Sequence, residues 1–200
     1  DQKSQKLIYC LKKNIELPWV ARATIFLDGC DPPFHAHNAQ YIPLSRPADF
    51  SDFLRLVCPP EEDEEKTTHF AFANSDIIFD ASLGSVAAAL ARVEPNNIVC
   101  LTRREMDGNF PKGLDPGRTQ DAWLLPQQVL PALLLDQLSG IRLGVPGCEH
   151  LLAAAFLAHG FNLWNPCQDA LAIHADPQPR SYVDNDERYW GFYVYVPACK

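Results

Sequence analysis

The sequence lacks several features that mark common functional classes. It has no G-x-G-x-x-G and no Walker A pattern, so Rossmann dehydrogenases and P-loop enzymes lose support. None of its apolar runs approaches the ~18 residues of a membrane span, and we expect no membrane span. It also lacks an excess of basic residues. With 17 Lys and Arg against 25 Asp and Glu, its formal charge is −8, so we expect no nucleic-acid partner.

The seven cysteines are widely spaced and form no C-x-x-C pair. A disulfide framework or a Cys-rich zinc module has a different spacing, so we interpret them mostly as buried free thiols of a cytoplasmic protein. A zinc site built on Cys30, His35 and His37 is a less favoured alternative, because no fourth ligand follows at a fixed spacing. The chain starts at Asp1, and we expect residues 1–200 to be a single domain excised from a longer chain.

Apolar periodicity predicts strands that alternate with helices, and hence an α/β fold with a mostly parallel sheet flanked by helices. The expected helices cover residues 3–15, 48–57, 81–93 and 148–160. The expected strands cover residues 21–29, 39–45, 96–105, 121–126, 161–166 and 170–175, with a further strand beginning at residue 70.

That strand beginning at residue 70 is interrupted by polar residues. In "FAFANSDIIFD", residues 70–80, Asn74, Ser75 and Asp76 separate two apolar runs. Open α/β sheets bind ligands outside the carboxyl ends of their strands. Asp76 and Asp28 are expected at two such ends, and the charged run 103–105, which begins with Arg103, follows a third. The alternative is that Asp76 caps a turn and Asp80 caps the next helix, and the residues alone leave both interpretations open.

The segment "FANSDIIFD" resembles the metal-binding segment of GT-A glycosyltransferases. In that family a strand ends in an Asp-x-Asp motif, which holds a divalent cation against the diphosphate of the sugar donor. Asp76 matches the last acid, and Asn74 stands where the first acid is usual. The resemblance implies Mn²⁺ or Mg²⁺ at Asp76, with Asn74 and Ser75 beside the donor. Such a cation neutralises charge on the departing diphosphate.

A second segment, "GVPGCEHLLAAAFLAHGFNLWNP", carries the same resemblance. Many inverting GT-A enzymes have a Glu-Asp pair whose second acid lies three residues before a helical Leu and eleven before a closing Gly. Glu149, Leu152 and Gly160 have this spacing, with Cys148 in the place of the first acid. The resemblance implies that Glu149 deprotonates the acceptor hydroxyl. An acid in a first helical turn is also stabilised by the helix dipole, which is the structural alternative.

Two later segments complete the resemblance. In "LAIHADPQPRSY", His174 is expected as a second metal ligand, with Arg180 and Tyr182 near the phosphates. In "RTQDAWLLP", Asp121 is a second candidate for the catalytic acid or base, and Trp123 offers a platform for a sugar ring. The alternatives are a structural histidine, a turn aspartate and a core tryptophan.

The resemblance implies a nucleotide-sugar-dependent glycosyltransferase of the GT-A fold. It covers roughly residues 5–182 as short motifs, and the sequence lacks the strand that opens these domains before their first helix. The expected reaction moves a sugar from a nucleotide-diphosphate donor to a saccharide or other hydroxyl acceptor, with inversion, in polysaccharide biosynthesis. The alternative is a GT-A-like domain without catalysis that binds or scaffolds within a larger polysaccharide-assembly protein. Further domains of the same protein are expected partners in either case.

Overall fold

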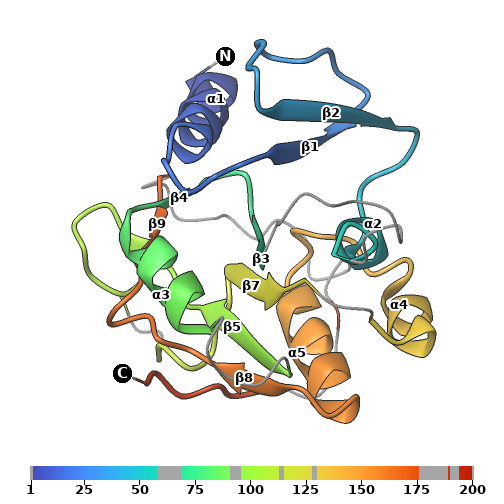
Figure 1. Ribbon diagram of the computed structural model, residues 1–200, viewed down its shortest axis with the longest axis vertical. Coiled ribbons are helices and arrows are strands. Elements are labelled where there is room, and N and C mark those ends of the chain that lie inside the picture. The colour runs from blue at the N-terminus through green and yellow to red at the C-terminus, as the bar shows by residue number, and fades with distance from the viewer. Residues whose placement is uncertain are drawn as a thin grey trace.

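A four-stranded sheet lies at the centre of the α/β fold (Figure 1). The computed structural model describes residues 2–57, 69–90, 96–112, 115–127, 130–175, 189 and 194–199. The strand order is β3 (His69–Ala73), β7 (Ala122–Pro126), β5 (Asn97–Leu101) and β8 (Asn162–Trp164). β7 is antiparallel to β3 and to β5, whereas β5 and β8 are parallel.

Two smaller sheets accompany the central one. In the first, β1 (Ala23–Asp28) and β2 (Ala39–Leu44) are parallel. In the second, β9 (Ala172–His174) is antiparallel to β4 (Ile77–Phe79) and parallel to β6 (Arg104–Glu105). Strand orientation is therefore mixed, and the prediction of a mostly parallel sheet is not confirmed. The apolar pattern could not reveal this, because strands buried on both faces look alike in either orientation.

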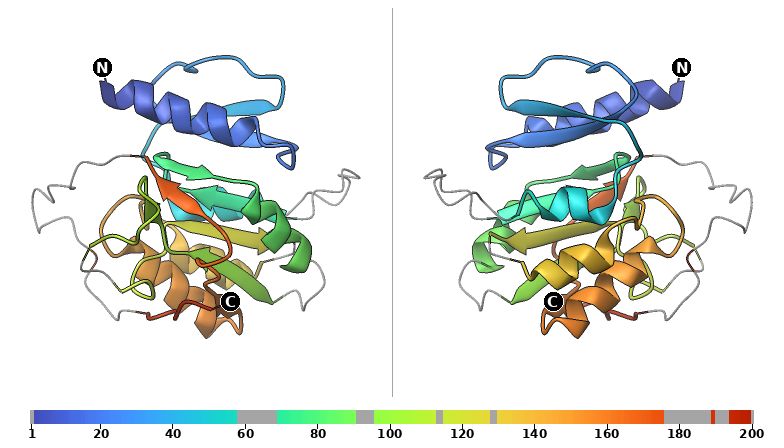
Figure 2. Two further views of the ribbon diagram at one scale, coloured as in Figure 1. Left: turned by 90° about the vertical axis from the view of Figure 1, so that its left-hand side faces the viewer. Right: turned by 90° about the vertical axis from the view of Figure 1, so that its right-hand side faces the viewer.

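The described helices are α1 (Gln2–Ile15), α2 (Phe50–Leu54), α3 (Ser82–Leu90), α4 (Ala132–Leu138) and α5 (Cys148–Ala158). The helices predicted from periodicity at residues 3–15 and 148–160 are confirmed. Gly160 follows α5 with φ +82°, the left-handed conformation predicted for a glycine that closes a helix. Figure 2 shows α1, β1 and β2 as a layer on one side of the central sheet.

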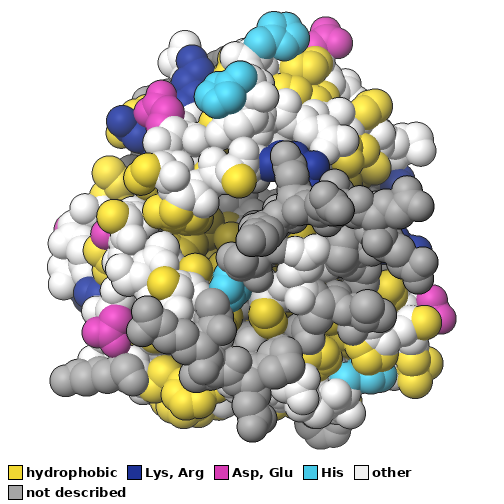
Figure 3. Space-filling model, viewed as in Figure 1, with side chains coloured by type: hydrophobic (Ala, Val, Ile, Leu, Met, Phe, Trp, Pro, Cys, Tyr) yellow, Lys and Arg dark blue, Asp and Glu magenta, His cyan; other side chains and the backbone are white. Residues whose placement is uncertain are grey.

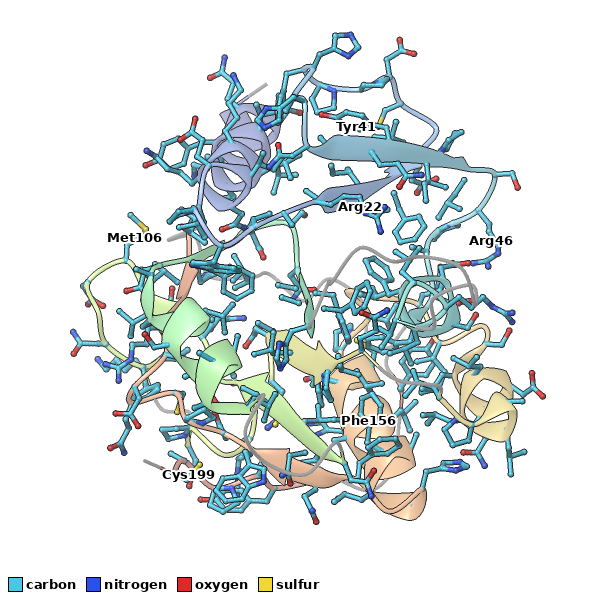
Figure 4. The ribbon with its side chains drawn as sticks, in the orientation of Figure 1. Arg22, Tyr41, Arg46, Met106, Phe156 and Cys199 are labelled. Atoms are coloured by element: carbon cyan, nitrogen blue, oxygen red, sulfur yellow. The ribbon has the colours of Figure 1, made fainter. Side chains whose placement is uncertain are left out.

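Alternation along the central strands divides the core between the two faces of the sheet. On β5, Ile98 and Cys100 belong to the cluster that packs against α2, α4 and α5. Val99 and Leu101 belong to the cluster that includes α3 and β4. Phe156 of α5, labelled in Figure 4, has no exposed surface, and its ring lies 5.8 Å from that of Trp123 on β7. Burial on both faces fixes the register of the strands, because a slip by one residue would exchange the side chains that face the two clusters.

The last turn of α1 is joined to β4 by one side chain. Asn14 Nδ2 donates to the Ile77 carbonyl at 2.8 Å, and Asn14 Oδ1 accepts from the Phe79 N–H at 2.8 Å. The opposite edge of β4 pairs with β9. The Asn14 amide therefore occupies the position that the backbone of a neighbouring strand would take along β4.

Asp49 organises the start of α2. It is 3% exposed and forms a reciprocal capping box with Asp52. Its carboxylate also accepts from the Ser51 hydroxyl at 2.7 Å and from the Gly140 N–H at 2.9 Å. Burial alone raises the pKa of Asp49. The hydrogen bonds and the charge of Arg46 together lower it by more, so the pKa lies below its ordinary value of 3.8. Asp49 thus ties α2 to the end of α4.

The Asp49→Ala substitution should lower the free energy of unfolding by about 2–4 kcal/mol. It removes an N-cap and leaves the Gly140 N–H without its acceptor. Since the pKa of Asp49 is lowered by folding, its stabilisation is present above pH 3.8 and is lost as the pH falls through the folded-state pKa. Urea unfolding at neutral and acidic pH measures both effects. The exposed Asp136→Ala is the control and should change stability by less than about 0.5 kcal/mol. Equal losses in the two variants would contradict the assigned role of Asp49.

Candidate functional site

Polar residues meet at one edge of the central sheet because of the register of its strands. Ala122, the first residue of β7, pairs with Ala73 at the end of β3 and with Leu101 at the end of β5. The residues just beyond these ends are therefore close together. The Asp121 N–H donates to the Leu101 carbonyl at 2.9 Å, and the Asn74 N–H donates to the Asp121 carbonyl at 3.4 Å. The carboxyl ends of β3 and β5 thus open at a common edge, where ligands of open α/β sheets bind.

The small sheet β4-β9-β6 stands at the same edge. β4 follows β3 through the turn at residues 74–76, and β6 follows β5 after two residues. His174 on β9 pairs with Ile77 on β4 and with Glu105 on β6. Because Asp76 directly precedes Ile77, the carboxylates of Asp76 and Glu105 lie on either side of His174.

Five side chains form a continuous acid–base cluster. His174 Nε2 lies 3.2 Å from Asp76 Oδ2, and His174 Nδ1 lies 3.1 Å from Glu105 Oε2. The other oxygen of Glu105, Oε1, is 3.5 Å from Arg103 Nε. Arg103 Nη1 donates to Asp121 Oδ1 at 2.9 Å. Acidic and basic groups therefore alternate from Asp76 to Asp121.

The acid–base cluster is shielded and rich in negative charge. The side chains of His174, Arg103 and Asp121 are only 3%, 13% and 8% exposed. Three carboxylates face one guanidinium and one imidazole. Asp121 Oδ2 is buried and accepts no hydrogen bond from the described residues. With a neutral imidazole the cluster has an excess of negative charge, which favours a bound cation.

The pKa of His174 lies above its ordinary value of 6.5. The hydrogen bond to Asp76 is the main cause, and the hydrogen bond to Glu105 adds to it, whereas burial and the positive charge of Arg103 oppose it. Without a metal, His174 therefore favours the charged form that pairs with both carboxylates. A metal ion would have to displace the proton on Nε2.

Asp76 Oδ2 and His174 Nε2 have the spacing of adjacent ligands on one octahedral cation. With metal–ligand distances of 2.0–2.1 Å, adjacent ligands of an octahedron are about 3.0 Å apart. The observed distance is 3.2 Å. In the described residues, however, no group of three or more His, Cys, Asp and Glu side chains is placed to hold one ion. The remaining ligands would have to be water and oxygens of the substrate, as is common for Mg²⁺.

Asp80 caps the next helix, as the capping alternative predicted. Asp80 Oδ1 accepts from the Ser82 N–H at 2.9 Å, where α3 begins. Asp76 instead reaches His174, which is 98 positions away in the sequence. The polar interruption after β3 therefore joins two distant parts of the chain.

Trp123, proposed as a sugar platform, is a core residue. It is 3% exposed, and its ring stacks on Phe72 at a centroid distance of 6.3 Å. It also packs against Phe156, with ring centroids 5.8 Å apart. A ring covered in this way cannot present a face to a sugar, so the core alternative describes Trp123.

Glu149 lies in the first turn of α5, as predicted. Its carboxylate is 25% exposed and accepts from the Cys148 thiol at 3.7 Å, and the imidazole of His150 is 3.9 Å away. Burial, together with the charge of Glu149, raises the pKa of Cys148 to about 12. Within the described part of the chain Glu149 contacts these two neighbours, and its catalytic role stays a prediction.

The remaining candidate residues fall into two groups. Asp28 is exposed at the end of β1, and Ser75 is exposed in the turn that contains Asp76. Arg180 and Tyr182 lie outside the described residues. Of the candidates, the structure therefore brings together Asn74, Asp76, Arg103, Asp121 and His174.

Glu105 belongs to the acid–base cluster but is not among the candidate residues predicted from the sequence. Its position could have indicated a role in the site, because the charged run 103–105 follows a predicted buried strand. Arg104, in the same run, extends elsewhere and donates to the Cys167 carbonyl, with its guanidinium over the Phe110 ring. Only the pairing of β6 with β9 determines which of these charged side chains faces His174.

The zinc alternative has little support in the structure. Cys30, His35 and His37 are exposed. Among the described residues, no group of three or more His, Cys, Asp and Glu side chains, these included, is placed to hold an ion. The six described cysteines are free thiols. Cys58 lies outside the described residues.

The surface supplies two further observations. On the face shown in Figure 3, the described Lys and Arg side chains are dispersed among acidic and hydrophobic ones and form no single basic patch. Among the helices that the structure describes, none combines the length and apolar character needed to cross a lipid bilayer.

Comparisons with protein-family models, with curated proteins and with solved structures found no significant match.

The raised pKa of His174 predicts how stability changes with pH. Below pH 6.5 the protonated ring pairs with Asp76 and Glu105, and this stabilisation is lost as the pH rises through the higher folded-state pKa. In metal-free buffer, the stability difference between the wild type and His174→Gln should therefore be largest at mildly acidic pH and shrink at alkaline pH. Urea unfolding across this range measures the difference. His159→Gln, at the exposed end of α5, is the control and should show a smaller dependence. A difference that grows with pH would contradict the assigned interaction.

Proposed function

We propose that this chain is a metal-dependent glycosyltransferase of the GT-A type, which transfers a sugar from a nucleotide-diphosphate donor to a saccharide or other hydroxyl acceptor. The observation that carries the proposal is the 3.2 Å approach of Asp76 Oδ2 to His174 Nε2. These two residues come from separate segments, and each segment on its own resembles a metal-binding part of the GT-A family. Their meeting at the open edge of the sheet supports a common site.

The proposed roles follow from the position of each group. Asp76 and His174 would hold Mn²⁺ or Mg²⁺, and the bound ion would neutralise negative charge on the departing diphosphate. Asn74 and Ser75 precede Asp76 in the same turn and lie beside the donor. Arg103 orients Asp121 through the hydrogen bond from Nη1 to Asp121 Oδ1 at 2.9 Å. Asp121 Oδ2, which accepts no hydrogen bond from the described residues, is then left to accept one from a sugar hydroxyl.

Glu149 is the proposed general base. In an inverting displacement the acceptor oxygen attacks opposite the departing diphosphate, so the base and the metal ligands flank the sugar on different sides. In this proposal Glu149 serves the acceptor side of the sugar, and Asp76 and His174 serve the diphosphate side. Glu149 lies in the first turn of α5, and its side chain is 25% exposed, so an acceptor hydroxyl can approach it.

The GT-A fold and the location belong to the same proposal. The α/β architecture and the site beyond the ends of β3 and β5 support the fold, although β1 and β2 form a sheet of their own. The free thiols support a cytoplasmic location, since reducing compartments keep cysteines unpaired.

A binding or scaffold domain without catalysis is the second candidate. Two substitutions in the family pattern favour it, since Asn74 and Cys148 stand where acids are usual. Such a domain would bind a nucleotide-sugar donor without transferring its sugar. Separate measurements of binding and of turnover therefore distinguish the two candidates.

The Asp76→Asn substitution should preserve the fold and abolish metal-dependent nucleotide binding. It keeps the size of the side chain but removes the charge that a hard cation requires. Calorimetry with a nucleoside diphosphate, with and without Mn²⁺, should show a loss of at least about 100-fold in the Mn²⁺-dependent affinity. Asp80→Asn is the matched control, because it makes the same change four positions along the chain and can retain the cap of α3. Unchanged Mn²⁺-dependent affinity in Asp76→Asn would remove the metal assignment.

The Glu149→Gln substitution should lower turnover by at least ~100-fold and spare donor binding. Glutamine preserves the shape of the side chain but cannot take the proton of the acceptor hydroxyl. Release of nucleoside diphosphate from a panel of sugar donors measures turnover, and calorimetry measures donor binding. Near-normal turnover in this variant would shift the role of base to Asp121, which Asp121→Asn then tests. Donor binding without turnover in the wild type would favour the scaffold candidate.

A further inference from the structure

His174 uses both of its ring nitrogens. Nε2 faces Asp76 at 3.2 Å, and Nδ1 faces Glu105 at 3.1 Å. In a metal site the nitrogen that binds the ion must carry no proton, so the other nitrogen carries it and donates it to an acceptor. Glu105 is the acceptor that this geometry provides.

Glu105 is itself held in place from two directions. The pairing of β6 with β9 sets it directly opposite His174. Its second carboxylate oxygen, Oε1, lies 3.5 Å from Arg103 Nε. The next residue, Met106, is 62% exposed and lies at the outer edge of the molecule in Figure 4. Glu105 is therefore the last side chain of this segment that faces the site.

We infer that Glu105 is a positioning residue, which fixes the tautomer and orientation of His174 so that Nε2 and Asp76 hold the cation. This inference rests on the proposed metal-dependent function. Glu105 has no assigned contact with the cation or the substrate and acts through the imidazole. Its carboxylate accepts the Nδ1 proton, increases the electron density on the ring and prevents the ring from turning away from Asp76.

The alternative is a purely structural role, in which Glu105 only pairs with Arg103. The two roles make different demands on the side chain. Positioning His174 requires an oxygen that accepts a hydrogen bond, which glutamine still provides. Pairing with Arg103 requires a charge, which glutamine and leucine both lack.

The test measures Mn²⁺ affinity of the full chain by the electron paramagnetic resonance signal of free Mn²⁺, with no nucleotide or acceptor present. Glu105→Leu should bind Mn²⁺ about 10- to 100-fold more weakly than the wild type. Glu105→Gln should recover most of that loss, because its amide oxygen accepts the Nδ1 proton. Asp107→Asn, an exposed acid two positions further along the same loop, removes the same charge and should bind Mn²⁺ as the wild type does.

A second measurement follows the hydrogen bond without any metal. In protein labelled with ¹⁵N-histidine, the Nδ1–H proton of His174 should give a downfield resonance protected from exchange. This resonance should persist in Asp76→Asn and disappear in Glu105→Leu. Circular dichroism of each variant shows whether the fold is retained.

The outcomes separate this inference from the proposed function. If Asp76→Asn abolishes Mn²⁺ binding while both Glu105 variants bind as the wild type does, the role of Glu105 is overturned and the metal site remains. Equal losses in Glu105→Gln and Glu105→Leu would assign Glu105 to charge pairing and also overturn the inference. If the wild type does not bind Mn²⁺, the metal site and the positioning role fail together, whatever the resonance shows.

Discussion

The insertion of β7 between β3 and β5 is the constraint on which the rest of the structure depends. It aligns Ala73, Leu101 and Ala122 at one edge of the sheet, so the polar residues beyond them are brought together. The same register directs Trp123 into the core and leaves Asp121 at the edge. Folding stability and site geometry are therefore controlled by the same pairing, and a one-residue slip would disrupt both.

Much of the local structure could be predicted from the sequence, because local patterns determine it. The apolar stripe of α1 and the left-handed Gly160 after α5 both follow from their own segments. Strand orientation could not be predicted. β5 is buried at all five of its residues, and a run of this kind has no alternation that distinguishes a parallel from an antiparallel neighbour. The position of β7 depends on contacts between segments far apart in the chain.

The same division applies to the candidate site. Asp76 and His174 could be selected because each lies at a strand end within a recognisable motif, and the structure brings them within hydrogen-bond distance. Trp123 and Glu105 could not be assigned in this way. Whether an aromatic ring is buried depends on partners such as Phe156, and whether an acid in a charged run faces a site depends on its cross-strand neighbour. The motifs indicated candidate residues, whereas the tertiary pairing determined which of them lie together.

The Asn14 amide, which covers the free edge of β4, has a consequence for self-association. An uncovered strand edge presents N–H and C=O groups to any passing chain and is a template for intermolecular β-sheet growth. Here a helix side chain closes that edge, and Asn14 is the penultimate residue of α1. If the last turn of α1 unfolded, the backbone groups of β4 that Asn14 now bonds would be exposed. The last turn of α1 therefore also protects β4 from pairing with a strand of another molecule.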